Sequence, residues 1–429
     1  MKLYHDYKTL FSFILICSLF VFPIVFLHAQ TATELNSKIS EKNSDIDALE
    51  KEIASYQNQL NTIGKQKSSL SSSINQLDIT KKKLNADIAV TQKKIEKTNL
   101  EIKSLSSQIG TKEGLIANDK SSISSGIRTI NEVETESLIE IVLSRDSFTN
   151  AWNDIDNIVS VREKVRDRIT ELKQIKGELE DTRKVTESAK KELESLKAEL
   201  ADQKKIVEQN ANEKKRLLAQ TKNSESNYQK LLKEKLAKKE AFEKELLEYE
   251  SQLKFILDPS LLPSGHVLNW PLDSIYITGY FSKTGANKAL YSNGFHNGVD
   301  FRASVGTPVK AMADGTILGV GDTDKVCSGA SFGKFVFIKY SNGLSSIYGH
   351  LSLIKVSQGQ KVARGEIVGY SGNTGYSTGP HLHVSVYASS AVKMQYRAST
   401  ACGGQTYYMP ISATEGYLNP LTYLPVYKQ

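Results

Sequence analysis

The feature that most constrains this chain is its lack of proline between Pro23 and Pro259, a run of 235 residues (24–258) in which glycine is also scarce. Proline and glycine are the residues that most weaken a helix interior. Apolar residues in the first part recur in steps of four and three over about ten heptads, which is typical of a coiled-coil seam. The seam residues are Ile39, Ile46, Leu49, Ile53, Tyr56, Leu60, Ile63, Leu70, Ile74, Leu77, Leu84, Ile88, Ile95, Ile102, Leu105 and Ile109.

A second periodic stretch follows the first. The apolar positions of this second stretch are Ile158, Val165, Ile169, Leu172, Leu179, Leu193, Leu196, Leu200, Phe242, Leu246, Tyr249, Leu253 and Ile256. The separating segment, 138–152, is apolar on several faces and contains turn formers, so it predicts a hairpin tip. Residues 31–257 therefore predict a long antiparallel coiled-coil hairpin with arms of about 110 residues, or ~160 Å each if fully helical. A plain spacer or a dimerisation rod remains an alternative.

The charge distribution separates this segment from the rest of the chain. The chain has 55 Lys plus Arg and 48 Asp plus Glu. Residues 264–429 hold 13 basic and 7 acidic residues, and residues 1–30 hold 2 basic and 1 acidic. Residues 31–263 therefore hold 40 of each and are neutral overall. Such a chain is neither one compact domain nor a polytopic membrane protein. The basic residues are not clustered in runs, so we expect an anionic extracellular polymer as partner and no nucleic acid.

The first 29 residues resemble an export signal. Lys2 and Lys8 precede an apolar run, and Leu27-His28-Ala29 could be a cleavage site before Gln30. An uncleaved membrane anchor is the alternative, because the run is just long enough to span a bilayer. Either way, we expect the remainder to be exported to the cell envelope, in the periplasm or at the cell surface, where disulfides form.

Proline returns at Pro259 and Pro263, where the helical pattern must end. Residues 258–268 predict a linker. From there on, short runs rich in β-formers alternate with glycine about every ten residues, so residues 269–429 predict an all-β domain. The expected fold class is thus a helical hairpin followed by an all-β domain.

The histidines of the β domain suggest a metal site. His296 precedes Asp300 by four residues, in a loop that enters a strand. His381 and His383 are two apart in a strand and so point to one face. Two imidazoles and one carboxylate suit zinc, with the fourth position left for a water.

These residues stand in segments that resemble the LytM/lysostaphin-type zinc metallopeptidases, which cut peptidoglycan peptides. The resembling segments are 296–300 (His-Asn-Gly-Val-Asp), 306–311, 314–315, 348–352 (Tyr-Gly-His-Leu-Ser), 359–365 and 372–383. The resemblance implies that His296, Asp300 and His383 bind one Zn²⁺ per chain and that His350 and His381 flank the metal-bound water. The sequence does not decide which of those two histidines is mainly the base, or which peptide bond is cleaved.

The helical hairpin resembles that of the EnvC and PcsB type division-associated proteins. We therefore expect an endopeptidase that cuts peptide cross-links of peptidoglycan in cell-wall remodelling or cell separation and is regulated through the coiled coil. The resemblance also implies an FtsEX-like membrane complex as partner of the hairpin. The alternative is a non-catalytic activator of a cell-wall amidase at the division site, in which the β domain has lost its ligands.

Three departures from the family pattern bear on the site. Ser385 stands where relatives often have an acidic residue, and residues 282–293 lack the usual arginine-and-proline pattern. A polar insertion near 392–412 carries Cys402, and Cys327 lies in another unusual segment. We predict a Cys327–Cys402 disulfide that staples these insertions beside the cleft, and a pair of free buried thiols is the alternative.

Overall fold

The structure is a computed structural model that describes residues 32–64, 68–134, 147–282, 295–377 and 379–427. The predicted export segment, 1–29, and the centre of the predicted hairpin tip, 138–146, lie outside the described residues. Within the described ranges, no helix is both long and apolar enough to cross a membrane. The chain forms two compact units, one of residues 1–41 and 100–186 and one of residues 42–99 and 187–429.

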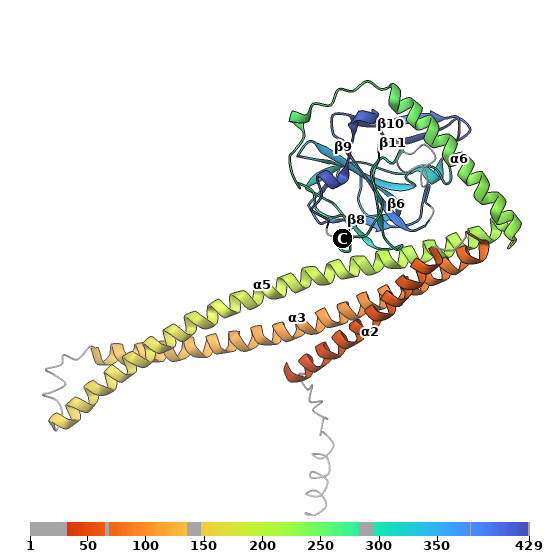
Figure 1. The fold of residues 1–429 in the computed structure, drawn as a ribbon. Coiled ribbons are helices and arrows are strands. Elements are labelled where there is room, and N and C mark those ends of the chain that lie inside the picture. Colours follow the sequence, from red (N-terminus) through yellow and green to blue (C-terminus); the bar gives the residue numbers. More distant parts are fainter. Residues whose placement is uncertain (1–31, 65–67, 135–146, 283–294, 378, 428–429) are drawn as a thin grey trace, which may run out of the picture. The chain divides into compact units, whose positions relative to one another are not determined.

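Long helices form the N-terminal part, as the sequence predicts (Figure 1). They are α2 (Ala32–Gly64), α3 (Leu70–Glu134), α5 (Phe148–Thr221) and α6 (Glu225–Gln252). In the first unit, Lys112 pairs with Glu178 at 3.1 Å. In the second, Lys214 pairs with Asp78 at 2.6 Å. Because residue numbers rise on α5 as they fall on α3, the two helices pair antiparallel and form the predicted hairpin.

The arms are not continuous, which corrects the sequence prediction. α2 ends at Gly64, and α3 begins at Leu70 after Ser69, whose hydroxyl accepts a hydrogen bond from the backbone N–H of Ser72. α2 then runs back along α3, where Lys93 pairs with Asp45 at 2.9 Å. The heptad frame continues across this break, so periodicity alone could not reveal it, whereas glycine followed by an N-capping serine is the signal for it.

The second arm breaks as well. Lys222 and Asn223 both adopt left-handed backbone angles, and Ser224 caps α6. On α6, Phe242 and Leu246 are buried against residues of the β domain. The sequence analysis assigned both to the seam of the coiled coil, which is wrong. The helix also ends at Gln252, earlier than the prolines require.

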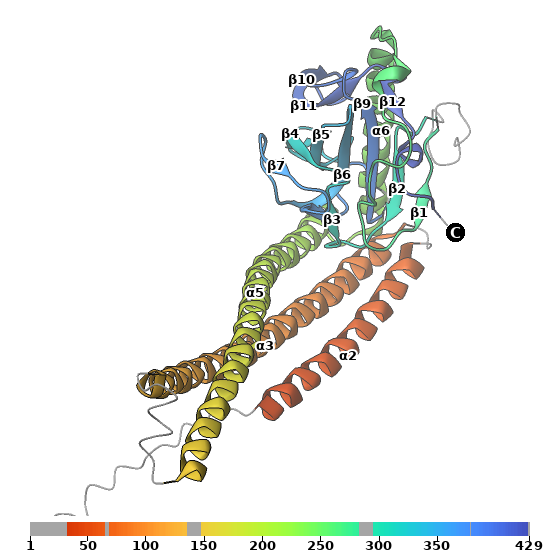
Figure 2. The ribbon, with the colours of Figure 1, turned by 90° about the vertical axis from the view of Figure 1, so that its left-hand side faces the viewer.

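An antiparallel sheet forms the centre of the C-terminal domain (Figure 2). Its strands follow the order β1-β2-β9-β6-β5-β4-β7, with β12 beside β9, and β8 beside β3 and β6. The strands are β1 (Ile277–Gly279), β2 (Val299–Arg302), β3 (Pro308–Lys310), β4 (Gly315–Asp322), β5 (Lys334–Tyr340), β6 (Leu344–Ile354), β7 (Lys361–Val362), β8 (Ile367–Ser371), β9 (His381–Ala388) and β12 (Tyr417–Leu418). The all-β domain is confirmed.

The three strands β2, β9 and β6 carry four of the five residues of the predicted site, and His296 lies just before β2. Val299 and Phe301 on β2 and Leu382 and Val384 on β9 are fully buried in the main core. Strand alternation therefore turns the residues between them to the opposite face of the sheet. The hydrophobic pattern thus fixes the direction in which Asp300 and His383 point.

The insertion near 392–412 is a two-stranded hairpin rather than a polar loop. It consists of β10 (Val392–Ser399) and β11 (Gln405–Ser412), paired only with each other among the described residues. One of its faces is buried, with Tyr407, Met409 and Ile411 packed into a second apolar cluster that includes Phe242. The predicted Cys327–Cys402 disulfide is present and joins the turn of this hairpin to the segment after β4.

We expect loss of this disulfide to destabilise the β domain, because the bond closes a loop with a sequence separation of 75 residues. Replacing both cysteines by serine should lower the free energy of unfolding by about 2–4 kcal/mol. Guanidinium denaturation followed by tryptophan fluorescence measures this difference. The reduced wild type should lose as much stability as the variant, because both lack the cross-link. An unchanged midpoint for the double variant relative to the oxidised wild type would contradict a stabilising role.

Candidate metal centre

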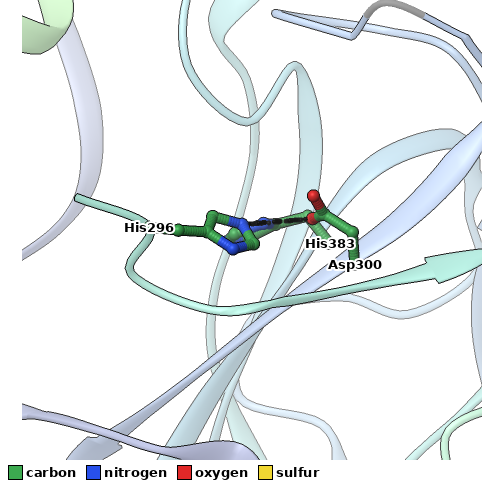
Figure 3. Close-up of side chains that lie close together, drawn as sticks. All are labelled: His296, Asp300 and His383. Atoms are coloured by element: carbon green, nitrogen blue, oxygen red, sulfur yellow. Dashed lines mark hydrogen bonds and ion pairs between the residues drawn. The ribbon is translucent and has the colours of Figure 1, made fainter. Parts of the chain in front are cut away.

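Three buried side chains meet at one point of the sheet, as Figure 3 shows. The His296 Nε2 atom lies 3.3 Å from Asp300 Oδ1 and 3.3 Å from His383 Nδ1. The His383 Nδ1 atom lies 2.9 Å from Asp300 Oδ1. These are three of the residues that the sequence analysis singled out, and the structure brings them together.

Strand pairing explains how they converge. Asp300 on β2 pairs directly with His383 on β9, and His296 lies just before β2, where it bridges to Ser282. Gly298 lies between them, and a Cβ atom there would come within 2.7 Å of the His383 ring. The sequence therefore requires glycine at this position for the imidazole to reach the carboxylate.

The three ligand atoms have the spacing that one metal ion needs. Zinc binds histidine nitrogen at about 2.0–2.1 Å, and two ligands of a regular tetrahedron are then about 3.3 Å apart. All three ligand atoms lie within 4.8 Å of one another. Their separations of 3.3, 3.3 and 2.9 Å are close to the distance between two ligands of a tetrahedral zinc ion. The donor set of two imidazoles and one carboxylate leaves one tetrahedral position open. The residues present thus fit a catalytic metal centre.

Outer hydrogen bonds fix the orientation of both imidazoles. The His296 Nδ1 donates to the carbonyl oxygen of Tyr280 at 2.9 Å. The Ser385 hydroxyl lies 2.8 Å from His383 Nε2 and donates to Asn297 Oδ1 at 3.3 Å, so His383 Nε2 is the donor to Ser385. The other nitrogen of each ring, Nε2 of His296 and Nδ1 of His383, therefore faces the point where the three side chains meet. Ser385 therefore supplies the support that relatives often take from an acidic residue.

His350 and His381 lie beside this centre. Their ring centroids are 4.6 Å apart, and His381 Nε2 is 3.7 Å from Asp300 Oδ1. The Nδ1 atoms lie 2.8 Å from the carbonyl oxygens of Thr374 and Gly379, respectively, and therefore donate to them. In a neutral ring, that leaves a lone pair on each Nε2. Both histidines can thus accept a proton at the centre.

The backbone at His350 is unusual. His350 adopts a φ of +59°, in the left-handed region that non-glycine residues rarely occupy. Its backbone N–H donates to the Phe332 carbonyl at 2.7 Å, next to an irregularity in the pairing of β5 with β6. Bulges of this kind re-aim a side chain, and such strain is concentrated at functional sites.

Burial and neighbouring charges shift the protonation of the centre. Burial alone would raise the pKa of Asp300, but hydrogen bonds from His296 and His383 and the charge of the imidazoles hold it well below its usual value. Burial, reinforced by the charges of His381 and His383, lowers the pKa of His350 far below that of a free imidazole. Burial also lowers the pKa of His383. The carboxylate is thus ionised and these two imidazoles neutral near pH 7, which is the state that binds a metal.

The centre opens into a cleft of about 620 Å³. The β domain contributes all five predicted site residues to its wall, together with Thr278, Phe295, Asn297, Arg302, Ser331, Phe332 and Tyr376. Helix α6 contributes Phe242, Glu243, Leu246, Leu247 and Glu250, all of which line the same cleft. A helix from the coiled-coil segment therefore borders the space in which a substrate must bind.

Sequence reasoning found the five histidine and aspartate residues but missed this helix and the backbone groups that support the site. The carbonyl groups of Tyr280, Thr374 and Gly379 have no signature in side-chain chemistry, because any residue supplies one. The only signal for α6 was the break at Asn223-Ser224, beyond which the apolar residues need not follow the earlier seam.

Comparison with known proteins agrees with this geometry. Residues 294–395 match the family model described as Peptidase family M23. The DD-carboxypeptidase/endopeptidase Mpg of Neisseria meningitidis is 45% identical over 94 residues, which are 22% of this chain and 20% of that protein. The peptidoglycan DD-endopeptidase ShyA of Vibrio cholerae is 44% identical over 88 residues, 20% and 19% of the two chains. The chain thus spans about a fifth of the length of these curated relatives.

A solved structure is similar in sequence over the same part of the chain. The catalytic domain of lysostaphin from Staphylococcus simulans is 38% identical, with 26% of this chain covering 77% of that domain at a TM-score of 0.21. The match to the family model includes His296, Asp300, His350, His381 and His383, and it lies wholly within the β domain. The C-terminal part of this chain is therefore a domain of peptidase family M23.

Proposed function

We propose that the protein is a zinc-dependent endopeptidase that hydrolyses peptide cross-links of bacterial peptidoglycan. The observation that carries this proposal is the tetrahedral spacing of the His296, Asp300 and His383 ligand atoms, with the Nε2 lone pairs of two further histidines beside them. The names of the relatives, among them a peptidoglycan DD-endopeptidase and a glycyl-glycine endopeptidase, supply the substrate class.

The chain's own residues suit peptide hydrolysis. Zinc, when bound, would supply Lewis acidity that acidifies a water and polarises the scissile carbonyl. The Nε2 lone pair of His350 or His381 accepts the proton of the attacking water. The same groups, once protonated, stabilise negative charge on the carbonyl oxygen and return a proton to the leaving amine. Their Nδ1 bonds to Thr374 and Gly379 hold the rings in place during these steps.

Helix α6 supports the expected regulation through the coiled coil. Phe242 packs on Tyr407 with ring centroids 5.1 Å apart. The Glu245 carboxylate accepts hydrogen bonds from the Ser399 hydroxyl at 3.0 Å and from the backbone N–H of Ala401 at 3.1 Å. We propose that α6, docked in this way on the β10–β11 hairpin, restricts access to the cleft, and that its release admits the substrate.

The cellular setting remains the one that the sequence suggests. We propose that the protein acts in the cell envelope, in wall remodelling or cell separation, and that an FtsEX-like membrane complex binds the end of the helical hairpin. Phe148 and Trp152, near that end, support such a contact, because 69% and 60% of these apolar side chains are exposed. Large exposed aromatic groups are typical of binding surfaces.

The second candidate, a non-catalytic amidase activator, is less well supported. That reading requires a β domain without its ligands, whereas here each of the five site residues has the expected chemistry and place. The α6 contacts fit either function, because an endopeptidase and an amidase activator would both be regulated by release of α6 from the β domain. Digestion of pure peptidoglycan separates the two.

We expect the full chain to bind one zinc ion tightly through His296, Asp300 and His383. Asp300→Ala should abolish tight binding, because it removes a ligand and its charge. Ser385→Ala should weaken binding by about tenfold to a hundredfold, because His383 loses the group that orients it. Competition against a chromogenic chelator measures the affinity.

The matched control for these variants is His266→Ala, a histidine outside the cleft lining, which should leave the affinity unchanged. Unaltered zinc affinity in Asp300→Ala would refute the assigned ligand set.

We expect His350→Ala and His381→Ala to lower the rate of cross-link cleavage while zinc stays bound. Each loss should be about a hundredfold to ten-thousandfold, the range measured for general acid–base groups. The assay is digestion of purified peptidoglycan with added zinc, followed by mass spectrometry of the released muropeptides.

In that assay, a chelator and His383→Ala serve as negative controls. Loss of cross-linked dimers at the wild-type rate in digests with His350→Ala would exclude this histidine from proton transfer. A zinc-loaded wild type that cleaves nothing alone but stimulates a purified amidase would replace the endopeptidase by the activator.

We expect α6 to be held more firmly at acidic pH. Burial raises the pKa of Glu250 from its ordinary 4.5 to about 8, against the opposing effects of Tyr417, Ser412 and the Arg397 charge. Between these two pH values, the Glu250 carboxyl is therefore protonated in the docked state and ionised when α6 is released. Docking is strongest below a pH of about 4.5 and weakens by about tenfold per unit up to about 8.

Hydrogen exchange of the α6 amides measures this docking independently of catalysis. Glu250→Gln, which carries no charge at any pH, should make the protection of α6 nearly independent of pH between those limits. The matched control is Glu248→Gln, an exposed neighbour on the same helix. Equal pH dependence in Glu250→Gln and wild type would show that this carboxyl does not control docking.

A further inference from the structure

Arg302, the last residue of β2, lies on the same face of the sheet as the metal centre. It pairs with His381 across the strands, just as Asp300 pairs with His383. Residues two apart on a strand point to the same side, about 7 Å apart along it. Arg302 also lines the cleft that contains the centre. Its positive charge therefore lies next to the metal ligands, two residues along β2 from Asp300.

An aromatic ring holds the guanidinium of Arg302. Its Cζ atom lies 3.8 Å from the ring centroid of Tyr276, and its backbone N–H donates to the Tyr276 carbonyl at 2.8 Å. Such stacking restricts the long side chain without using its N–H donors. Less conformational entropy is then lost when the guanidinium binds a ligand.

Within the described ranges, no carboxylate forms an ion pair with Arg302, although the cleft lining includes Asp300, Glu243 and Glu250. These acidic groups contact histidine, lysine and tyrosine residues instead. The segment 283–294 between β1 and β2 contributes two lysines and no acidic residue to the sequence. The protein itself thus leaves this guanidinium without a carboxylate among the residues described.

We propose that Arg302 is a specificity-determining residue that binds a free carboxylate of the substrate peptide. This inference rests on the proposed function. A guanidinium presents two parallel N–H groups that match a carboxylate, a geometry that an uncharged amide does not offer. An extended peptide advances about 3.4 Å per residue, so the carboxylate lies within about two residues of the cleaved bond. The preferred substrates are cross-linked peptides with ionised carboxyl groups.

The test compares cross-linked muropeptide dimers with the same dimers after carbodiimide amidation with ammonium, which converts carboxylates to primary amides. The full chain, loaded with zinc, should hydrolyse the free acid with a kcat/KM at least about tenfold higher. Arg302→Gln should remove this preference by raising KM for the acid while kcat stays the same. Arg302→Lys should restore part of it. Because both substrates compete for the same open molecules, the ratio does not depend on how much of the chain α6 keeps closed.

Arg364→Gln is the matched control, since it removes an equal charge from the β domain outside the cleft and should keep the preference. Equal use of acid and amide by wild type, or the same preference in Arg302→Gln, would overturn the proposal. A change in zinc affinity in Arg302→Gln would assign the residue a structural role instead. A zinc-loaded wild type that cleaves neither form would instead reject the proposed endopeptidase, and this inference with it.

Discussion

The pairing of β2 with β9 is the interaction on which the site depends. Its register places Asp300 opposite His383 and Arg302 opposite His381, so one ladder of backbone hydrogen bonds aligns a metal ligand pair and a charged neighbour. The register is itself fixed by Val299, Phe301, Leu382 and Val384, which are fully buried on the other face. A shift by one residue would bury the ligands and expose the core, and its cost in apolar burial keeps the centre in place.

The sequence predicted most of the fold class and named five residues that the structure brings to one cleft, for reasons that lie in particular positions. His381 and His383 could be assigned to one face because strand alternation has a fixed period of two. The disulfide could be inferred because Cys327 and Cys402 are the two cysteines that follow the predicted export segment. In contrast, the carbonyl partners of His296, His350 and His381 come from backbone groups, whose positions depend on tertiary structure alone.

The helical segment shows the opposite case, in which a regular pattern led to a wrong assignment. Phe242 and Leu246 have the spacing of a coiled-coil seam, and the same spacing serves any helix with one buried face. What separates the two outcomes is the left-handed pair Lys222 and Asn223, where the helix direction changes. Beyond this point the apolar face meets the β10–β11 hairpin. Periodicity indicates that one face of a helix is buried. The turn that precedes the helix decides which part of the protein that face packs against.

The disulfide-linked segment connects that hairpin to the histidines of the candidate site. Asp324, close to Cys327, accepts hydrogen bonds at 2.6 Å from the backbone N–H groups of both Gly329 and Gly375. Gly375 follows Thr374, whose carbonyl orients His350. A Cβ atom on Gly333 would overlap this backbone, so the two segments approach each other as closely as glycine allows. The surface that receives α6 and the loop that positions His350 therefore belong to one rigidly packed region, and a helix that docks on the first is held directly beside the second.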